Sequence, residues 1–328
     1  MKHGGDLTQA IKQFGGKAGD WLDLSTGINP IAYPVHDIAW QQSLLPLPEE
    51  AAEEKLIAAA RMAYGVPPHL SCVAAPGTQA LIQRLPYAFR PQQVAIVSPT
   101  YASHEESWKA AGFTPLRVTR LEEVPDSCCL VVLVNPNNPT GQSYSPQDLL
   151  ALAKMLEARG GTLIVDEAYA DVMPHISILP HLNDEPVVVL RSFGKFYGLA
   201  GLRLGFAVGL KPIVNWLEQQ FGSWAVSGPA LAIGAKALRD TNWHRATMEH
   251  LWERTHALHE LLTAQKIQIV GRTPLFTLIS VGDANTLHEQ LARHHIWTRV
   301  FDYSAHWIRL GLPKNDEDLA RLAKALKE

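Results

Sequence analysis

The most informative segment of the chain is Ser192-Phe193-Gly194-Lys195-Phe196-Tyr197-Gly198-Leu199-Ala200-Gly201-Leu202-Arg203. It places Lys195 shortly after the apolar run 187–190, among glycines and aromatic residues. A lysine in such a setting can lose its charge by desolvation, and the neutral amine is a nucleophile. Taken alone, the segment also fits a lysine on a surface loop, so its meaning depends on the neighbouring segments.

Nearly continuous apolar runs of strand length alternate with helix-like segments over the first two thirds of the chain. Such runs predict strands that are buried on both faces, at 71–75, 94–98, 115–119, 130–135, 162–166, 187–193 and 204–208. Helical spacing of apolar residues predicts helices at 49–64, 78–89, 102–112 and 146–159. We therefore predict an α/β fold with an open, mostly parallel sheet of about seven strands.

The rhythm changes near residue 227, where long helical segments at 229–239 and 242–265 precede shorter strands and helices. This pattern predicts a smaller α+β domain. A chain of 328 residues also exceeds what one hydrophobic core usually holds. We expect an N-terminal arm over residues 1–35 that joins the small domain and the site, a large domain over 36–225 and a small domain over 226–328.

Polar residues follow several of the predicted strands, and ligands of open α/β sheets lie beyond the carboxyl ends of the strands. The segment Pro76-Gly77-Thr78-Gln79 is a turn that opens a helix, where free N–H groups can face a phosphate or simply be capped. The run 135–141, Asn-Pro-Asn-Asn-Pro-Thr-Gly, has the composition of a turn. Asp166 ends another run, which is compatible with a cofactor contact, a Mg²⁺ ligand or a helix cap.

Three segments, in this order, resemble the pyridoxal-phosphate (PLP) enzymes of the aspartate-aminotransferase fold type. They are Asn138-Pro139-Thr140-Gly141, Asp166-Glu167-Ala168-Tyr169 and the lysine segment 192–203. A Schiff-base enzyme needs an amine that can be neutral, a buried anion facing the pyridine nitrogen, and a cup for the cofactor phosphate. The resemblance implies PLP as the cofactor and Lys195 as the Schiff-base lysine.

The resemblance also implies roles for the residues around the cofactor. Asp166 would keep the pyridine nitrogen protonated, so that the ring is an electron sink. Tyr169 and Asn138 would bind the phenolate oxygen, although a buried structural tyrosine is the alternative for Tyr169. Lys195, Asp166 and Tyr169 are the implied catalytic residues. The implied cofactor-binding residues are Gly77, Thr78, Gln79, Tyr101, which stacks on the ring, Asn138, Asp166, Tyr169, Ser192, Lys195 and Arg203.

Within this fold type, the chain is most similar to the threonine-phosphate decarboxylases of cobalamin biosynthesis, which are related to histidinol-phosphate aminotransferases. The similarity is carried by His3-Gly4-Gly5, by residues 22–30, Leu-Asp-Leu-Ser-Thr-Gly-Ile-Asn-Pro, and by 191–198. Gly194 stands where aminotransferases of this group commonly have Ser or Thr. Leu47-Pro48 stands near the place of a Tyr-Pro pair, so the tyrosine that those aminotransferases bring from the neighbouring subunit has no counterpart there.

The resemblance implies decarboxylation of L-threonine O-3-phosphate to (R)-1-amino-2-propanol O-2-phosphate. The expected substrate-binding residues are His3, Asn29, Arg299 and Arg309, because arginine forks match carboxylate and phosphate groups. A pair of exposed strand-edge arginines is the alternative for Arg299 and Arg309. Two other functions stay open: a histidinol-phosphate-type or other class I/II aminotransferase, and a PLP-binding protein without catalysis, against which the complete lysine and cofactor set argues.

Composition narrows the partners. The net charge is −3, with 29 Lys and Arg against 32 Asp and Glu, which gives no global attraction for nucleic acid or anionic lipid. The three cysteines are most simply reduced thiols, and no signal-peptide or membrane-spanning run is visible. His256 and His259 do not match a zinc pattern, so no metal is expected. We expect a cytoplasmic enzyme that, by the family resemblance, forms a homodimer.

Overall fold

The computed structural model describes residues 4–90 and 92–327, and tertiary contacts divide them into two compact units. The large unit comprises Tyr33–Asn138 and Gln142–Thr241; the small unit comprises the described residues up to Ala32, Pro139–Gly141 and those from Asn242 onward. Helix α8 (Gly228–Ala237) packs on α2 (Glu50–Ala63). The division therefore falls after α8, whereas the sequence placed the small domain from residue 226.

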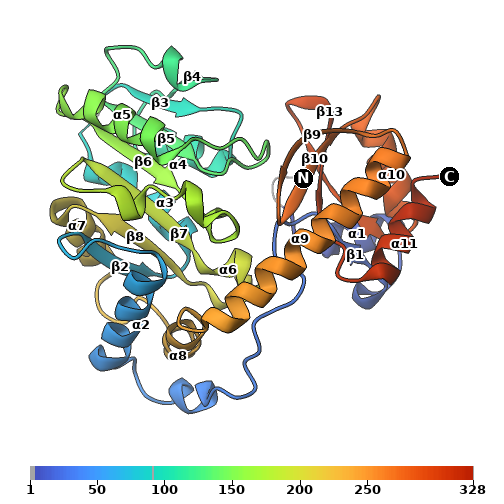
Figure 1. The fold of residues 1–328 in the computed structure, drawn as a ribbon, viewed down its shortest axis with the longest axis horizontal. Helices are drawn as coiled ribbons and strands as arrows, with labels where there is room; N and C mark the ends of the chain where they lie inside the picture. The colour runs from blue at the N-terminus through green and yellow to red at the C-terminus, as the bar shows by residue number, and fades with distance from the viewer. Residues whose placement is uncertain (1–3, 91, 328) are drawn as a thin grey trace. The chain divides into compact units, whose positions relative to one another are not determined.

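The large unit is built on a seven-stranded sheet in the order β2-β8-β7-β6-β5-β3-β4 (Figure 1). Strand β8 is antiparallel to both of its neighbours, and the other pairs are parallel. This confirms the predicted α/β fold with an open, mostly parallel sheet. The strands are β2 (Ser71–Ala75), β3 (Val94–Val97), β4 (Leu116–Val118), β5 (Leu130–Val134), β6 (Thr162–Asp166), β7 (Val187–Ser192) and β8 (Gly205–Gly209).

Helices of the large unit connect these strands. Helix α5 shows why one of them begins where it does, since the Ser145 hydroxyl accepts from the Asp148 N–H and the Asp148 carboxylate accepts from Ser145 N. Pro146 in the first turn loses no intrahelical bond. The other helices of this unit are α3 (Thr78–Arg84), α4 (Ala102–Ala110), α6 (Phe193–Phe196) and α7 (Lys211–Phe221), and α5 spans Pro146–Glu157.

The core of the large unit lies along the central strands. Every residue of β5 and of β6 is buried, as expected for parallel strands that are covered on both faces. Trp108 of α4 is buried against Phe113, with ring centroids 4.7 Å apart. Each fully buried Leu, Val or aromatic side chain stabilises the fold by about 1.5–3 kcal/mol, so this core fixes the ends of the strands.

The small unit has a four-stranded antiparallel sheet in the order β12-β13-β10-β9 and a two-stranded parallel pair, β1-β11. The sequence predicted the long helix of this unit at 242–265 and shorter strands and helices after it, but it did not predict α1 or β1. Among the described residues, no helix is both long and apolar enough to cross a membrane. The elements are α1 (Leu7–Phe14), β1 (Leu22–Asp23), α9 (Thr241–Ala264), β9 (Gln268–Thr273), β10 (Phe276–Ser280), α10 (Ala284–Arg293), β11 (Ile296–Trp297), β12 (Arg299–Phe301), β13 (Ser304–Gly311) and α11 (Asp316–Ala325).

His288 of α10 makes the stability of the small unit sensitive to pH. Its ring is buried beside Trp297, and Nδ1 lies 2.7 Å from the Thr298 hydroxyl. Burial lowers the pKa of His288 from 6.5 to about 4. The unfolded chain therefore binds the proton more readily between these values, so this contribution to stability is present above pH 6.5 and is lost as the pH falls toward 4.

We expect His288→Asn to flatten the loss of stability between neutral pH and pH 5, because asparagine does not titrate. Urea unfolding at several pH values measures the free energy of unfolding of both proteins. His256→Asn is the control, since the side chain of His256 is 76% exposed. An equal fall in the free energy of unfolding for wild type and His288→Asn would contradict the prediction.

Candidate active site

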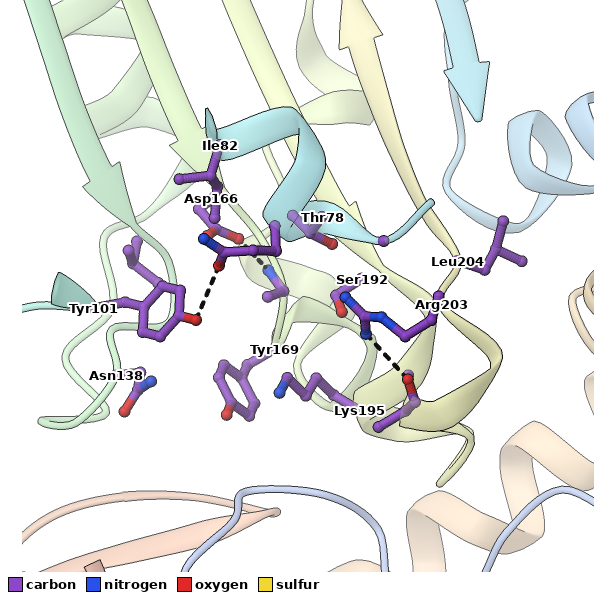
Figure 2. A pocket seen from close by; sticks show the side chains of 16 residues that line it. Thr78, Ile82, Tyr101, Asn138, Asp166, Tyr169, Ser192, Lys195, Arg203 and Leu204 are labelled. Carbon is purple, nitrogen blue, oxygen red and sulfur yellow. Dashed lines mark hydrogen bonds between the residues drawn. The ribbon is translucent and has the colours of Figure 1, made fainter. Parts of the chain in front are cut away.

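A pocket of the large unit lies at the carboxyl ends of β5, β6 and β7, beside the start of α3 (Figure 2). The structure brings all ten residues of the predicted cofactor site together there. The lining includes Gly77, Thr78, Gln79, Tyr101, Asn138, Asp166, Tyr169, Ser192, Lys195 and Arg203. Residues separated by more than a hundred positions thus share one cavity because parallel strands end at the same edge of the sheet.

Asp166 is held rigidly at the end of β6. Its side chain is 3% exposed, Oδ2 lies 2.9 Å from Nε2 of His104, and Oδ1 accepts from the N–H of Ala168 at 3.0 Å. The Ala168 bond is the local turn contact that a helix-capping aspartate would also make. The pairing with His104 goes beyond capping, because it fixes the orientation of the whole carboxyl group.

His104 is a site residue that sequence reasoning missed. It lies in the first turn of α4, and its ring is edge-on to that of Tyr101 at a centroid distance of 6.3 Å. Its side chain is 2% exposed. The signal available in the sequence was only that His104 follows Tyr101, the N-cap residue of α4, by three positions. The partner Asp166 is 62 positions away, so spacing alone could not reveal the pair.

Lys195 enters the pocket from α6, which directly follows β7. The residues around it are anchored, since the buried Phe193 ring stacks on Tyr197 with centroids 4.3 Å apart. Lys195 Nζ lies 5.9 Å from the centroid of the Tyr169 ring (Figure 2). The lysine is therefore a pocket residue on a fixed helical turn rather than a residue of a surface loop.

One end of the pocket is suited to an anion. Arg203 has a left-handed backbone, with φ of 56°, and its Nη1 donates to the carbonyl of Ala200 at 3.0 Å. Gly77 has φ of 86°, and a Cβ there would lie 2.5 Å from Arg203 Nη2. Left-handed conformations of non-glycine residues concentrate at functional sites. The Ser192 hydroxyl and the backbone N–H groups at the start of α3, including that of Thr78, complete a set of donors.

The opposite wall is formed by two linked loops. Asn137 donates from Nδ2 to the carbonyl of Pro99 at 2.9 Å and accepts from the hydroxyl of Thr100 at 2.6 Å. This link positions the neighbouring residues Asn138 and Tyr101. The Tyr101 hydroxyl donates to Oε1 of Gln79 at 3.0 Å (Figure 2), so the ring is oriented before any ligand binds.

The structure gives a steric reason for glycine at position 194. A Cβ at this position would lie 2.7 Å from the Cα atom of Ala200. The close approach of these two backbone segments leaves no room for the Ser or Thr that precedes the lysine in related aminotransferases. The departure noted in the sequence is therefore coupled to how the loop after Lys195 folds back on α6.

The remaining predicted residues belong to the small unit, apart from His3, which lies outside the described residues. Arg299 and Arg309 are directly opposite each other in the β12-β13 pair. Arg309 is buried on an inner strand and donates from Nη2 to the carbonyl of Ser25 at 2.7 Å, so the strand-edge alternative does not apply to it. Asn29 is also buried, and its side-chain oxygen accepts from the N–H of Ile31 at 2.9 Å.

The pocket residues fit PLP by their chemistry. They supply an amine, a buried carboxylate, amide and phenol groups, and an anion-binding end with a guanidinium, the Ser192 hydroxyl and backbone N–H groups. The glycine cradle at Gly77 leaves space that a Cβ would fill. In the part of the chain that the structure describes, no group of three or more His, Cys, Asp or Glu side chains could hold a metal ion.

Comparisons with known proteins agree with this chemistry. Residues 53–326 match the family described as aminotransferase class I and II. The chain is 42% identical to a threonine-phosphate decarboxylase of Sinorhizobium sp over 99% of its own length and 97% of the relative's. It is 40% identical, with the same coverage, to one of Pseudomonas aeruginosa. A histidinol-phosphate aminotransferase from Sinorhizobium meliloti, solved in complex with pyridoxal-5'-phosphate, has the same fold, with a TM-score of 0.87 at 19% identity over 98% of this chain and 93% of that one.

We expect Gly194→Ser to lower the free energy of unfolding by about 1–3 kcal/mol, the usual cost of overpacking. The added side chain must displace Ala200, whose Cα atom is too close. Thermal unfolding measures the effect. The matched control is Gly201→Ser, because a Cβ at Gly201 meets nothing within 4 Å. Equal melting temperatures for the two variants would show that the close approach is not a constraint.

Proposed function

Because the chain belongs to the aminotransferase class I and II family, we propose that it is a PLP-dependent decarboxylase. Its substrate is L-threonine O-3-phosphate, and its products are CO₂ and (R)-1-amino-2-propanol O-2-phosphate, a precursor of the corrin side chain in cobalamin biosynthesis. The observation that carries this proposal is the 42% identity to a threonine-phosphate decarboxylase over 99% of the chain. The pocket supports the cofactor, and the relatives support the reaction.

The pocket residues divide into those that hold the cofactor and those that act on it. Ser192, Thr78, Arg203 and the backbone at Gly77 would bind the phosphate, because they form the anion-binding end of the pocket. Tyr101 would stack on the ring. When bound, PLP supplies an electron sink that accepts the electron pair left at the substrate Cα when a bond there breaks.

Asp166 and Lys195 have the two proton-related tasks. The Asp166 carboxylate would hold the proton on the pyridine nitrogen, and His104 keeps that carboxylate oriented through the 2.9 Å contact. Lys195 Nζ would act as the nucleophile that binds the cofactor, and it is the pocket amine available to carry a proton to Cα after CO₂ leaves. Asn138 and Tyr169 would bind the phenolate oxygen from the same edge of the pocket.

The choice of bond depends on how the substrate is oriented. The bond that stands perpendicular to the cofactor ring breaks, so a residue that grips the carboxylate can select decarboxylation. Arg299 and Arg309 are the proposed substrate cations, one for the carboxylate and one for the phosphate, together with His3 and Asn29. Their guanidinium forks match both anions in geometry.

A homodimer in the cytoplasm is part of this proposal. The segment that includes the 3-10 helix Trp40–Leu44 exposes three leucines, with Leu44 64%, Leu45 94% and Leu47 64% accessible. A cluster of exposed large apolar side chains is typical of a protein interface. The three cysteines are free thiols, as in a reducing compartment. Light scattering on the purified protein would test the dimer directly.

We predict that the purified protein carries PLP in covalent linkage to Lys195. Borohydride reduction followed by peptide mapping should place the pyridoxyl group on this lysine, because it is the pocket lysine beside Tyr169. Lys195→Ala is the control and should retain no label. Labelling at Lys211 or Lys109 instead would remove Lys195 from its proposed role.

The reaction itself is tested by supplying threonine phosphate and following both CO₂ and pyridoxamine phosphate. We expect CO₂ in catalytic amounts. Arg309→Lys keeps the charge but loses the planar fork, so it should cost about 1–3 kcal/mol of transition-state stabilisation, roughly 5-fold to more than 100-fold in kcat/KM. Arg293→Lys, a change at a side chain that is 70% exposed, is the control.

One result of this assay would overturn the decarboxylase and favour the aminotransferase. The aminotransferase is favoured if pyridoxamine phosphate forms in stoichiometric amounts and no CO₂ is released. Amino transfer from glutamate to imidazole-acetol phosphate would accompany this result. Turnover of no amino acid by PLP-loaded protein would instead leave a binding protein without catalysis.

A further inference from the structure

A buried cluster of charged side chains lies next to the pocket along the chain but does not line it. The guanidinium of Arg191 forms two ion pairs, from Nη1 to Oε2 of Glu167 at 2.9 Å and from Nη2 to Oδ1 of Asp171 at 2.8 Å. The side chains of these three residues are 4%, 0% and 5% exposed. The Tyr64 ring covers the guanidinium, with its centroid 4.2 Å from Cζ.

Each member of the cluster is close in sequence to a pocket residue. Glu167 directly follows Asp166, and Asp171 is two residues after Tyr169. Arg191 directly precedes Ser192 in β7, and successive strand residues face opposite sides of a sheet. One guanidinium therefore ties together the backbone segments that carry Asp166, Tyr169 and Ser192.

The backbone of Arg191 adds a fourth link. Its carbonyl accepts from the hydroxyl of Thr78 at 3.0 Å, in a buried contact that joins β7 to the start of α3. Glu167 is held as well, since its carboxylate accepts from the Ser177 hydroxyl at 2.6 Å and from the Ile178 N–H at 2.8 Å. The cluster is thus connected to the segments that carry Thr78, Asp166, Tyr169 and Ser192.

Burial acts on both partners of the Glu167–Arg191 pair, and it raises the pKa of Glu167 although Arg191 opposes this effect. Burial alone would lower the pKa of Arg191, but Asp171 and Glu167 outweigh it and raise that pKa, so the guanidinium stays protonated. A buried ion pair is weak evidence for stability, because well-packed apolar residues often replace it without loss. Apolar residues cannot, however, reproduce the planar guanidinium, whose N–H groups hold two carboxylates at defined angles.

We propose that Arg191 is a positioning residue that sets the mutual placement of Asp166, Tyr169, Ser192 and Thr78 for cofactor binding. The inference rests on the proposed function, since it assumes that these four residues bind PLP. It assigns Arg191 a role in affinity and catalysis although its side chain does not line the pocket. Arg191 acts through Glu167 and Asp171, which hold the ends of the segments that carry the cofactor contacts.

The test compares Arg191→Lys with wild type in PLP affinity, kcat at saturating PLP, and melting temperature. Lysine keeps the charge but cannot bridge both carboxylates with a fixed fork. We expect PLP to bind at least tenfold more weakly and kcat to fall at least tenfold in folded, PLP-saturated protein. The control is Arg254→Lys, because Arg254, whose side chain is 11% exposed, is also paired with an acid, Asp316, but lies in the small unit. That variant should lose stability but keep PLP affinity.

A second variant covers the case in which Arg191→Lys does not fold. Asp171→Asn keeps the shape of the side chain and removes one ion pair, the one nearest Tyr169 in sequence. We expect the pH midpoint of the cofactor's visible absorption band to shift in this variant, because Tyr169 is proposed to bind the phenolate oxygen. A purely structural cluster would leave that midpoint unchanged.

The outcomes separate this inference from the proposed function. Wild-type PLP affinity and kcat in Arg191→Lys, with only a lower melting temperature, would overturn the positioning role and leave the decarboxylase intact. If the wild-type protein binds PLP but releases no CO₂, only the proposed decarboxylase activity is rejected. The positioning role of Arg191 can still be tested, because it is measured by the PLP affinity of Arg191→Lys. A wild-type protein that binds no PLP would overturn both.

Discussion

The constraint on which the site depends is that the central strands are buried on both faces. Every residue of β5 and β6 is buried, so nearly all of their side chains have to be apolar. Polar groups can emerge only where these strands end. Because β5, β6 and β7 run parallel, their carboxyl ends meet at one edge. The hydrophobic core thus determines where Asn138, Asp166 and Lys195 come together.

Close packing of backbone segments then sets the detailed positions of the pocket residues that the strand ends bring together. Gly77 and Gly194 sit where a Cβ would meet Arg203 and Ala200, respectively. The chain between Lys195 and Arg203 folds back on itself, which brings the amine and the guanidinium to one cavity. Arg203, whose φ is 56°, has a left-handed backbone, and the surrounding packing holds it in that conformation.

Much of this architecture follows from local patterns in the sequence. Continuous apolar runs predicted the seven strands of the sheet to within about one or two residues, and the segment resemblance brought together residues that line one pocket. The antiparallel direction of β8 was not predictable, since it depends on which neighbours a strand pairs with. Helix α7 was not predicted, although Val214 and Leu217 are buried and Ile213, Trp216 and Phe221 pack against the core at helical spacing. His104 was missed because its significance lies in a partner that only the fold supplies.

In the small unit, two arginines of a chain whose net charge is −3 lie on neighbouring strands. Arg299 and Arg309 are directly opposite in neighbouring antiparallel strands, an arrangement in which like charges repel and destabilise the sheet. Each guanidinium lies 5.3 Å from the centroid of an aromatic ring, Phe301 for Arg299 and Phe276 for Arg309, and such contacts offset part of the repulsion. If Arg299 and Arg309 bind the substrate as proposed, their pairing across two strands suits a ligand with two separate anionic groups, which a phosphorylated amino acid has.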